Sequence, residues 1–428
     1  MPLSGRVAIV AGCRTPFGKA GTVFSDLTAL DLAKTCTREL LDRADVDPAW
    51  VDTVVMGQVI PSVKAPNLAR EVVLRTGLPP AVPAHSVNLA CASANQAIVN
   101  AALVIREGLA EVAIAGGAES LSDVPILHGK KMARALIAAA RAKSLGARLR
   151  AFSGVRFRDL APDTPAIAEP STGLSMGQSA EKMAKENGIS RQEQDRIAHL
   201  SHLRAAAAVE DGRLRSEMCR VLVPPRYDVV VEADNLVRAD TSMEALAALP
   251  PVFDRRFGTV TAGNSSPLTD GAAAVLLMSE AKAQAEGYRP LAFIRSWAVE
   301  AVDPGGQLLM GPALAIPKAL ERAGLSLGDM DLIEMHEAFA AQVASNIQAL
   351  ESEQWAKDKL GRASAVGKVD GERLNVCGGS IALGHPFGAT GARITTTLAN
   401  ELARRNAKFG LLSVCAQGGM GFAMVLER

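Results

Sequence analysis

The sequence predicts an α/β fold in which two similar halves of the chain each pack helices against a mostly parallel sheet. Short apolar runs that end in glycine alternate with segments of helical spacing, a pattern typical of sheets covered on both faces. The second half also echoes the first, since residues 41–57 resemble residues 320–336 and residues 111–117 resemble residues 410–418. At 428 residues, the chain is long enough for two or three core-forming units.

In the first half, apolar runs and helical spacing predict the elements in order. Strands are expected over 7–12, 51–57 and 111–117, and helices over 26–44 and 67–77. An extended run over 81–88 leads into Cys91, and an alanine-rich helix over 93–108 leads out of it. Further along, a turn-rich segment over 260–271 precedes an apolar strand over 272–278.

Residues 125–172 interrupt this alternation with a basic, amphipathic stretch. Nine cations stand among apolar residues, with no acidic residue before Asp159: Lys130, Lys131, Arg134, Arg141, Lys143, Arg148, Arg150, Arg156 and Arg158. One or two helices are expected here. They could contact a membrane surface, a partner subunit or a phosphate-bearing substrate, or they could simply form a solvated cationic face. Residues 176–208 are expected to be helical and 212–249 mixed strand and loop. We interpret 122–251 as an inserted excursion from the sheet.

Composition excludes several classes of function. The formal charge of +1 gives no field that would recruit nucleic acid. The six cysteines form neither a CxxC pair nor a Cys/His metal spacing, which favours reduced thiols in a cytosol. No signal peptide is evident at the start, and no apolar stretch has the length of a spanning helix. We therefore expect a cytoplasmic protein with no metal site.

Cys91 is the strongest single candidate for chemistry. It stands where a strand is expected to turn into a helix, and unpaired backbone N–H groups together with the helix dipole favour thiolate there. A lone cysteine is nevertheless more often a small buried hydrophobe.

Three later segments are also candidates for functional sites. They are 335–340, which follows a strand and opens a helix, the glycine-rich loop 375–391, and 414–421 between two apolar strands. Considered alone, His336 is more readily interpreted as an ordinary residue at a helix start, and Cys415 is more readily interpreted as a packed thiol. His385 differs, because a histidine held between glycine and proline in so flexible a loop is costly to position without a use.

Together these segments resemble the thiolase family over almost the whole chain. The motifs that carry the resemblance stand in the family's order: 88–97 around Cys91, Ser175-Met176-Gly177, 261–266, Met310-Gly311-Pro312, 336–339, Gly384-His385-Pro386 and 415–419. The resemblance implies the duplicated five-layered α-β-α-β-α thiolase fold with an inserted loop domain. The expected division is 1–121 and 252–288 for the N-terminal half, 122–251 for the loop domain and 289–428 for the C-terminal half.

The resemblance also implies a role for each site residue. Cys91 is expected to carry the acyl group, with His385 taking its proton and Cys415 acting as a second acid and base. His336 and His385 are expected to donate to the thioester oxygen, and the backbone N–H groups of Cys91 and Gln417 to bind the other oxyanion. Of the two thiols, Cys91 is expected to be the more acidic.

The implied reaction is thiolytic cleavage of 3-ketoacyl-CoA to acetyl-CoA and a shortened acyl-CoA in fatty-acid β-oxidation. CoA is then a co-substrate, and no metal or redox cofactor is expected. The positions that match the family's CoA contacts are Met176, Ala262, Ser266, Met310 and Phe339, which suggest an apolar tunnel with one anchoring hydroxyl. Relatives of this kind are homodimers or tetramers.

Three departures from the common family pattern refine this prediction. His-Glu-Ala-Phe at 336–339, where most members have asparagine first, and the basic loop 130–158 both resemble the thiolase subunit of trifunctional fatty-acid oxidation complexes. A hydratase/dehydrogenase partner and peripheral membrane contact are therefore expected. Gln417 stands where a glycine is usual, which puts only the local loop conformation in question.

Three alternatives remain open at this point. One is a biosynthetic acetyl-CoA acetyltransferase with the same chemistry on a short substrate. Another is a ketoacyl-synthase-like condensing enzyme, which uses one cysteine and two histidines but lacks the Cys415 feature. The last is a non-catalytic thiolase-like lipid-binding or scaffold protein, which should have lost a catalytic residue.

Overall fold

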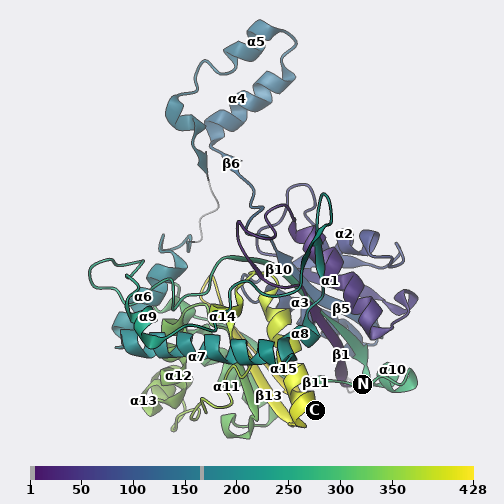
Figure 1. Ribbon diagram of the computed structural model, residues 1–428, viewed down its shortest axis with the longest axis vertical. Helices are drawn as coiled ribbons and strands as arrows, with labels where there is room; N and C mark the ends of the chain where they lie inside the picture. Colours follow the sequence, from purple (N-terminus) through teal and green to yellow (C-terminus); the bar gives the residue numbers. More distant parts are fainter. Residues whose placement is uncertain (1–4, 164–167) are drawn as a thin grey trace.

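The computed structural model describes residues 5–163 and 168–428 and has one large mixed sheet at its centre (Figure 1). Its strands lie in the order β12-β13-β14-β11-β1-β10-β5-β3-β4, with the short β2 (Gly18–Lys19) paired to β10. The two halves of this sheet meet where β1 (Val7–Arg14) pairs antiparallel with β11 (Ala292–Ala301). The first half of the chain supplies one side of this junction and the second half supplies the other.

In the first half, beside β1, the strands β3 (Thr53–Gly57), β5 (Val112–Glu119) and β10 (Thr269–Ser279) are buried on both faces, whereas the edge strand β4 (Ala84–Val87) is half-buried. Along β10, Ala272, Ala274 and Leu276 pack with the outer helices α1 (Ala29–Ala44) and α2 (Leu68–Arg75). The alternate residues Ala273, Val275 and Leu277 face the opposite cluster, as the two-residue period of a strand requires.

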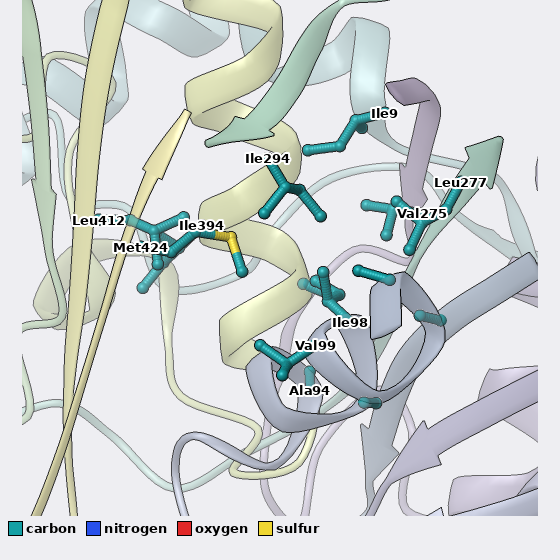
Figure 2. Packing of buried hydrophobic residues seen from close by; sticks show 14 of the residues in the cluster. Ile9, Ala94, Ile98, Val99, Val275, Leu277, Ile294, Ile394, Leu412 and Met424 are labelled. Atoms are coloured by element: carbon teal, nitrogen blue, oxygen red, sulfur yellow. The ribbon is translucent and has the colours of Figure 1, made fainter. Parts of the chain in front are cut away.

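The second half repeats this arrangement. Its strands β12 (Leu332–Met335), β13 (Phe409–Ala416) and β14 (Met420–Glu427) lie beside β11 and pack with α11 (Gly311–Ala323) and α12 (Ala340–Glu351). Between the two halves lie α3 (Ser93–Arg106) and α15 (Thr390–Arg405), whose apolar faces share one core cluster (Figure 2). The order of layers is thus helices, the first half of the sheet, α3 with α15, the second half of the sheet and helices, and the predicted fold class is confirmed.

Between β5 and β10, the residues that the structure describes add no strand to the central sheet. Two helices, α4 (Lys130–Arg141) and α5 (Leu145–Arg150), project from the body on the short pair β6 (Leu127–His128) and β7 (Pro162–Asp163) (Figure 1). The rest lies against the body: α6 (Met176–Glu186), α7 (Arg191–Glu210), α8 (Arg213–Glu217), β8 (Val221–Val223), β9 (Val229–Val231) and α9 (Met243–Ala247).

Two expectations for this region were wrong in detail. The helical stretch predicted over 176–208 is broken, because Gly188 takes a left-handed conformation (φ 65°) and the Ser190 side chain caps the start of α7. The segment 212–249, expected as strand and loop, contains the two short helices α8 and α9. The described residues also form the short helices α10 (Glu280–Ala285), α13 (Glu353–Trp355) and α14 (Ser380–Leu383). Among the described residues, no helix is both long and apolar enough to cross a membrane.

Candidate active site

Cys91 lies in a tight turn between β4 and α3. The preceding residue, Ala90, has a left-handed backbone (φ 46°), which is uncommon for a residue with a side chain. The turn is held by Ser93, whose hydroxyl donates to the Ala90 carbonyl (2.6 Å) and accepts from the Leu89 N–H (2.9 Å). Asn88 adds a bond from the Ala90 N–H to its side-chain oxygen (3.0 Å). This bonding fixes the position of the Cys91 thiol at the start of the helix.

His385 lies in the loop between α14 and α15. The residue before it, Gly384, has φ 99°, and a Cβ there would lie 2.7 Å from the Thr269 hydroxyl, so no larger residue fits without movement. The same hydroxyl accepts the backbone N–H of His385 (3.0 Å). His385 is therefore positioned by β10 of the first half as well as by its own loop.

The two residues meet across the halves of the protein. Nε2 of His385 lies 3.1 Å from Sγ of Cys91, and its Nδ1 lies 2.6 Å from the Thr390 hydroxyl. Thr390 donates its own hydrogen to the Pro386 carbonyl (3.2 Å), so its oxygen accepts from Nδ1–H. His385 then presents an unprotonated Nε2 to the thiol, as a general base requires.

The expectation that the helix start favours a thiolate at Cys91 is not met in the resting protein, whereas the expected order of the two thiols, with Cys91 the more acidic, stays a prediction. Burial raises the pKa of the Cys91 thiol to about 12, although the backbone N–H groups of Gln417 and Cys91 lower it in part. Burial also lowers the pKa of His385 to about 3, with the Arg393 charge adding to the effect. At neutral pH the resting pair is thus a neutral thiol and a neutral imidazole, because desolvation outweighs the helix N-terminus. Proton transfer must accompany attack on the substrate.

His336 lies beside His385, with ring centroids 4.2 Å apart and planes inclined by 50°. It follows β12 and is fully buried. Burial, the neighbouring His385 and Arg393 all lower its pKa well below the usual value, so the ring is neutral. Its Nε2 has no hydrogen-bond partner among the described residues.

Cys415 and Gln417 lie where β13 turns into β14. The Cys415 side chain is buried, and desolvation together with the neighbouring Cys91 raises its pKa well above the usual value. Gly418 and Gly419 adopt left-handed conformations in the turn, whereas Gln417 does not. The side-chain amide of Gln417 donates to the Ala168 carbonyl (2.8 Å). The turn therefore needs glycine at 418 and 419 but not at 417.

Three of the five predicted CoA-contacting residues share a cluster with Cys415. Met310 is buried there, and Met176 and Phe339 pack against it. Ser266 adjoins this cluster, because its backbone N–H donates to the Ala338 carbonyl (2.9 Å). Ala262 is exposed at the edge of its turn and is not a member of the cluster. Their contact with CoA stays a prediction.

Several residues that hold the site were not singled out from the sequence. Thr390 orients His385, and the buried Glu119 accepts the backbone N–H groups of Val59, Ile60 and Gly388 (3.0–3.1 Å). Burial raises the pKa of Glu119 to about 7, although its three hydrogen bonds from backbone N–H groups act to lower this pKa. The signal for Glu119 that the sequence offered was its position at the end of a buried strand. No sequence feature pointed to Val59, Ile60 or Gly388, whose N–H groups Glu119 accepts.

Cys91, His336 and His385 could in principle hold a metal ion, since one ligand atom of each lies within 4.8 Å of the others. Zn²⁺ bound by a thiolate and an imidazole would separate Sγ and Nε2 by about 3.5 Å. The observed 3.1 Å instead suits a hydrogen bond. The expectation of no metal stays a prediction.

Comparison with known proteins identifies the family. Residues 7–281 match the family model described as thiolase, N-terminal domain, and residues 288–428 match thiolase, C-terminal domain. This chain belongs to the thiolase family. It is therefore an acyltransferase, and the resemblance seen in the sequence is confirmed.

Named relatives and solved structures match this thiolase over 99–100% of its length. It is 51% identical over 422 residues to a 3-ketoacyl-CoA thiolase of Serratia proteamaculans (strain 568), covering 99% of this chain and 97% of that one. It is 50% identical over 426 residues to a 3-ketoacyl-CoA thiolase of Pseudoalteromonas translucida, covering 100% and 98% of the two chains. The Bacillus anthracis acetyl-CoA acetyltransferase has a TM-score of 0.86, and human mitochondrial 3-ketoacyl-CoA thiolase one of 0.84. Each is 36% identical and covers 99% of this chain and 98% of its own.

Proposed function

We propose that this thiolase cleaves 3-ketoacyl-CoA with CoA to give acetyl-CoA and a shortened acyl-CoA. The observation that carries the proposal is the 3.1 Å contact between Cys91 Sγ and His385 Nε2, because it pairs a nucleophile with a base oriented to accept its proton. The 3-ketoacyl-CoA thiolases that are 50–51% identical over the whole chain support the same reaction.

In the first half-reaction, Cys91 attacks the 3-keto carbon while His385 takes the thiol proton. The oxyanion formed there lies within reach of the backbone N–H groups of Cys91 and Gln417, both of which point at the thiol. The bond between C2 and C3 then breaks, and its electron pair forms the enolate of acetyl-CoA. His336 and the now protonated His385 donate to the enolate oxygen, and Cys415 protonates C2.

In the second half-reaction, CoA takes the place of acetyl-CoA. Cys415, left as a thiolate, accepts the proton of the CoA thiol, and the CoA sulfur attacks the acyl-Cys91 carbonyl. Collapse of this intermediate releases Cys91, which regains its proton from His385. Both sulfurs and both imidazoles return to their starting protonation states, so the cycle balances. The raised pKa of Cys415 supports its part, because the group must stay protonated until the enolate forms.

The proposal is tested by assaying the protein with 3-ketoacyl-CoA and CoA and by mass spectrometry of the acylated enzyme. We expect acetyl-CoA to be released and the acyl mass to appear on the peptide containing Cys91. Full turnover with Cys91 unmodified would refute the acyl-enzyme route. A ladder of chain lengths separates the degradative reaction from that of a short-chain acetyl-CoA acetyltransferase. Condensation with acyl-carrier-protein substrates tests for a ketoacyl synthase.

We further propose that the reaction serves fatty-acid β-oxidation in the cytoplasm, in a homodimer or tetramer. CoA is the only co-substrate required, and no step above uses a metal or redox cofactor. Sedimentation or light scattering of the purified protein tests the oligomeric state.

The projecting helices α4 and α5 are proposed as a docking surface for a hydratase/dehydrogenase subunit or a membrane. Apolar side chains are exposed alongside the basic ones, among them Ile137 (53%), Leu145 (73%) and Leu149 (68%). Reversing the charges of Arg148, Arg150 and Arg156 should leave thiolysis intact. The variant should bind anionic liposomes less well at low salt if the target is a membrane, and bind only the partner less well if it is a subunit. Unchanged binding of both would contradict the proposal.

A further inference from the structure

A buried chain of three polar side chains leads from α15 to His336. Nη2 of Arg393 donates to the Ser380 hydroxyl oxygen (3.1 Å), and this hydroxyl lies 2.9 Å from Nδ1 of His336. Ser380, His336 and Arg393 are each no more than 1% exposed. The mechanism above assigns no part to Ser380 or Arg393.

The direction of these hydrogen bonds follows from what each group is able to donate. A guanidinium has no acceptor, so Arg393 must donate, and Ser380 oxygen must accept. The single hydrogen of Ser380 then has Nδ1 of His336 as its acceptor. In the opposite arrangement Nδ1–H would donate to Ser380, whose own hydrogen would be left buried without a partner among the described residues, which is unfavourable. His336 is therefore protonated at Nε2, the nitrogen that has no partner among the described residues.

The two neighbouring histidines thus have opposite tautomers. Thr390 accepts from Nδ1 of His385 and leaves its Nε2 free to take a proton, whereas Ser380 donates to Nδ1 of His336 and leaves its Nε2 carrying one. A hydroxyl adjoins each ring. The two hydroxyls differ in their second hydrogen-bond partner. Thr390 donates to a carbonyl, that of Pro386, whereas Ser380 accepts from a guanidinium, that of Arg393.

We infer that Ser380 and Arg393 are positioning residues that hold His336 as a neutral hydrogen-bond donor, so that it stabilises the enolate oxygen and does not compete with His385 as a base. This inference rests on the proposed thiolase reaction and deepens it. Nη1 of Arg393 also lies 3.6 Å from Glu334 on β12, two residues before His336, which is within ion-pair distance but beyond a hydrogen bond. The positive charge of Arg393 also opposes protonation of both imidazoles.

The two half-reactions provide the test, because only one of them forms an enolate. Cleavage of 3-ketoacyl-CoA needs the His336 donor, whereas exchange of labelled CoA into a simple acyl-CoA through acyl-Cys91 does not. We expect Ser380→Ala to slow cleavage by about tenfold or more and to leave the exchange rate within about twofold of the parent. A variant that had merely loosened the site would slow both reactions.

Matched variants show whether the hydroxyl acts through His336. Ser380→Thr keeps the hydroxyl and should restore cleavage. Ser413→Ala removes another buried hydroxyl, one with no partner among the described residues, and should alter neither reaction. In a His336→Ala background, Ser380→Ala should have no further effect, because residues acting through one group are not additive. Equal slowing of cleavage and exchange, or an additive double variant, would overturn the inference.

A second measurement needs no substitution at Ser380. In the parent protein labelled with ¹⁵N-histidine, the ring nitrogens report their protonation directly, and a His336→Gln variant assigns the signals among the six histidines. We expect His336 protonated at Nε2 and His385 at Nδ1. His336 protonated at Nδ1 would overturn the inference while leaving the thiolase reaction itself intact, and absence of thiolysis in the parent protein would instead defeat the proposed function.

Discussion

The two halves of this thiolase share one framework but differ in the connections that reach the site. The connection between β5 and β10 spans residues 120–268, and its described parts, 120–163 and 168–268, add no strand to the central sheet. The corresponding strands β13 and β14 are joined by the short turn 417–419. Before the two central helices the difference is reversed. A tight turn joins β4 to α3 and carries Cys91, whereas the segment 361–389 that carries His385 into α15 is long and contains only the short helix α14.

This difference shows how a repeated framework is given an asymmetric site. The two central helices start close together, because Gly391 at the start of α15 lies against Asn95 of α3, where a Cβ would come within 2.2 Å of the Asn95 side-chain oxygen. The first half contributes the nucleophile there, and the second contributes both imidazoles and the second thiol. Variants in the two halves should therefore differ in how their effects divide between cleavage of 3-ketoacyl-CoA and exchange of CoA.

The largest effect is expected from Cys91→Ala, which removes the first half's contribution. Both cleavage of 3-ketoacyl-CoA and exchange of CoA into acyl-CoA should fall by about 10⁴-fold or more, because each passes through acyl-Cys91. Steady-state rates and isotope exchange measure the two reactions separately. Retained exchange would show that the acyl group is carried elsewhere.

The variant Cys415→Ala should separate cleavage of 3-ketoacyl-CoA from acylation of the enzyme. Cleavage should fall by about 10²–10⁴-fold, because the enolate loses its proton donor. A simple acyl-CoA should still acylate the enzyme, because His385 can pass the Cys91 proton to the leaving CoA sulfur in place of Cys415. Mass spectrometry of the variant mixed with acyl-CoA should find the acyl group on Cys91. An unacylated enzyme would place Cys415 in the first attack as well and would weaken the proposed division between the thiols.

The pH dependence of alkylation compares the two thiols without substrate. With its pKa raised to about 12, Cys91 has a thiolate fraction that increases about tenfold per pH unit. Alkylation of Cys91 by iodoacetamide should therefore rise by about 100-fold between pH 8 and pH 10. Peptide mapping distinguishes Cys91 from Cys415, which should react more slowly. A plateau near pH 7 would indicate a resting thiolate paired with an imidazolium.

The smallest effect is expected from Gln417→Gly in the β13–β14 turn. The variant keeps the backbone N–H near Cys91 but loses the side-chain bond to Ala168, so its stability should fall by about 1 kcal/mol and its rate should change by less than about threefold. Thermal unfolding and thiolysis rates measure these quantities. A loss of activity approaching that of Cys415→Ala would show that the side chain, and not only the backbone, serves the reaction.

Much of the framework could be predicted from the sequence because its signals are local. The alternation of apolar strands and helices, the echo between 41–57 and 320–336, and the ordered motifs around Cys91, His385 and Cys415 all lie within short stretches. The break at Gly188 and the helices α8 and α9 escaped prediction, because helix ends and short elements depend on caps and packing.

By itself, the sequence determined the family, the order of the elements and the four side chains proposed for the reaction. Tertiary structure alone decided their electrostatic state: Cys91 is a neutral thiol because burial outweighs the helix start, and His336 and His385 have opposite tautomers because Ser380 and Thr390 have different partners. Desolvation and hydrogen-bond direction depend on groups brought together from distant parts of the chain, and no local pattern encodes them.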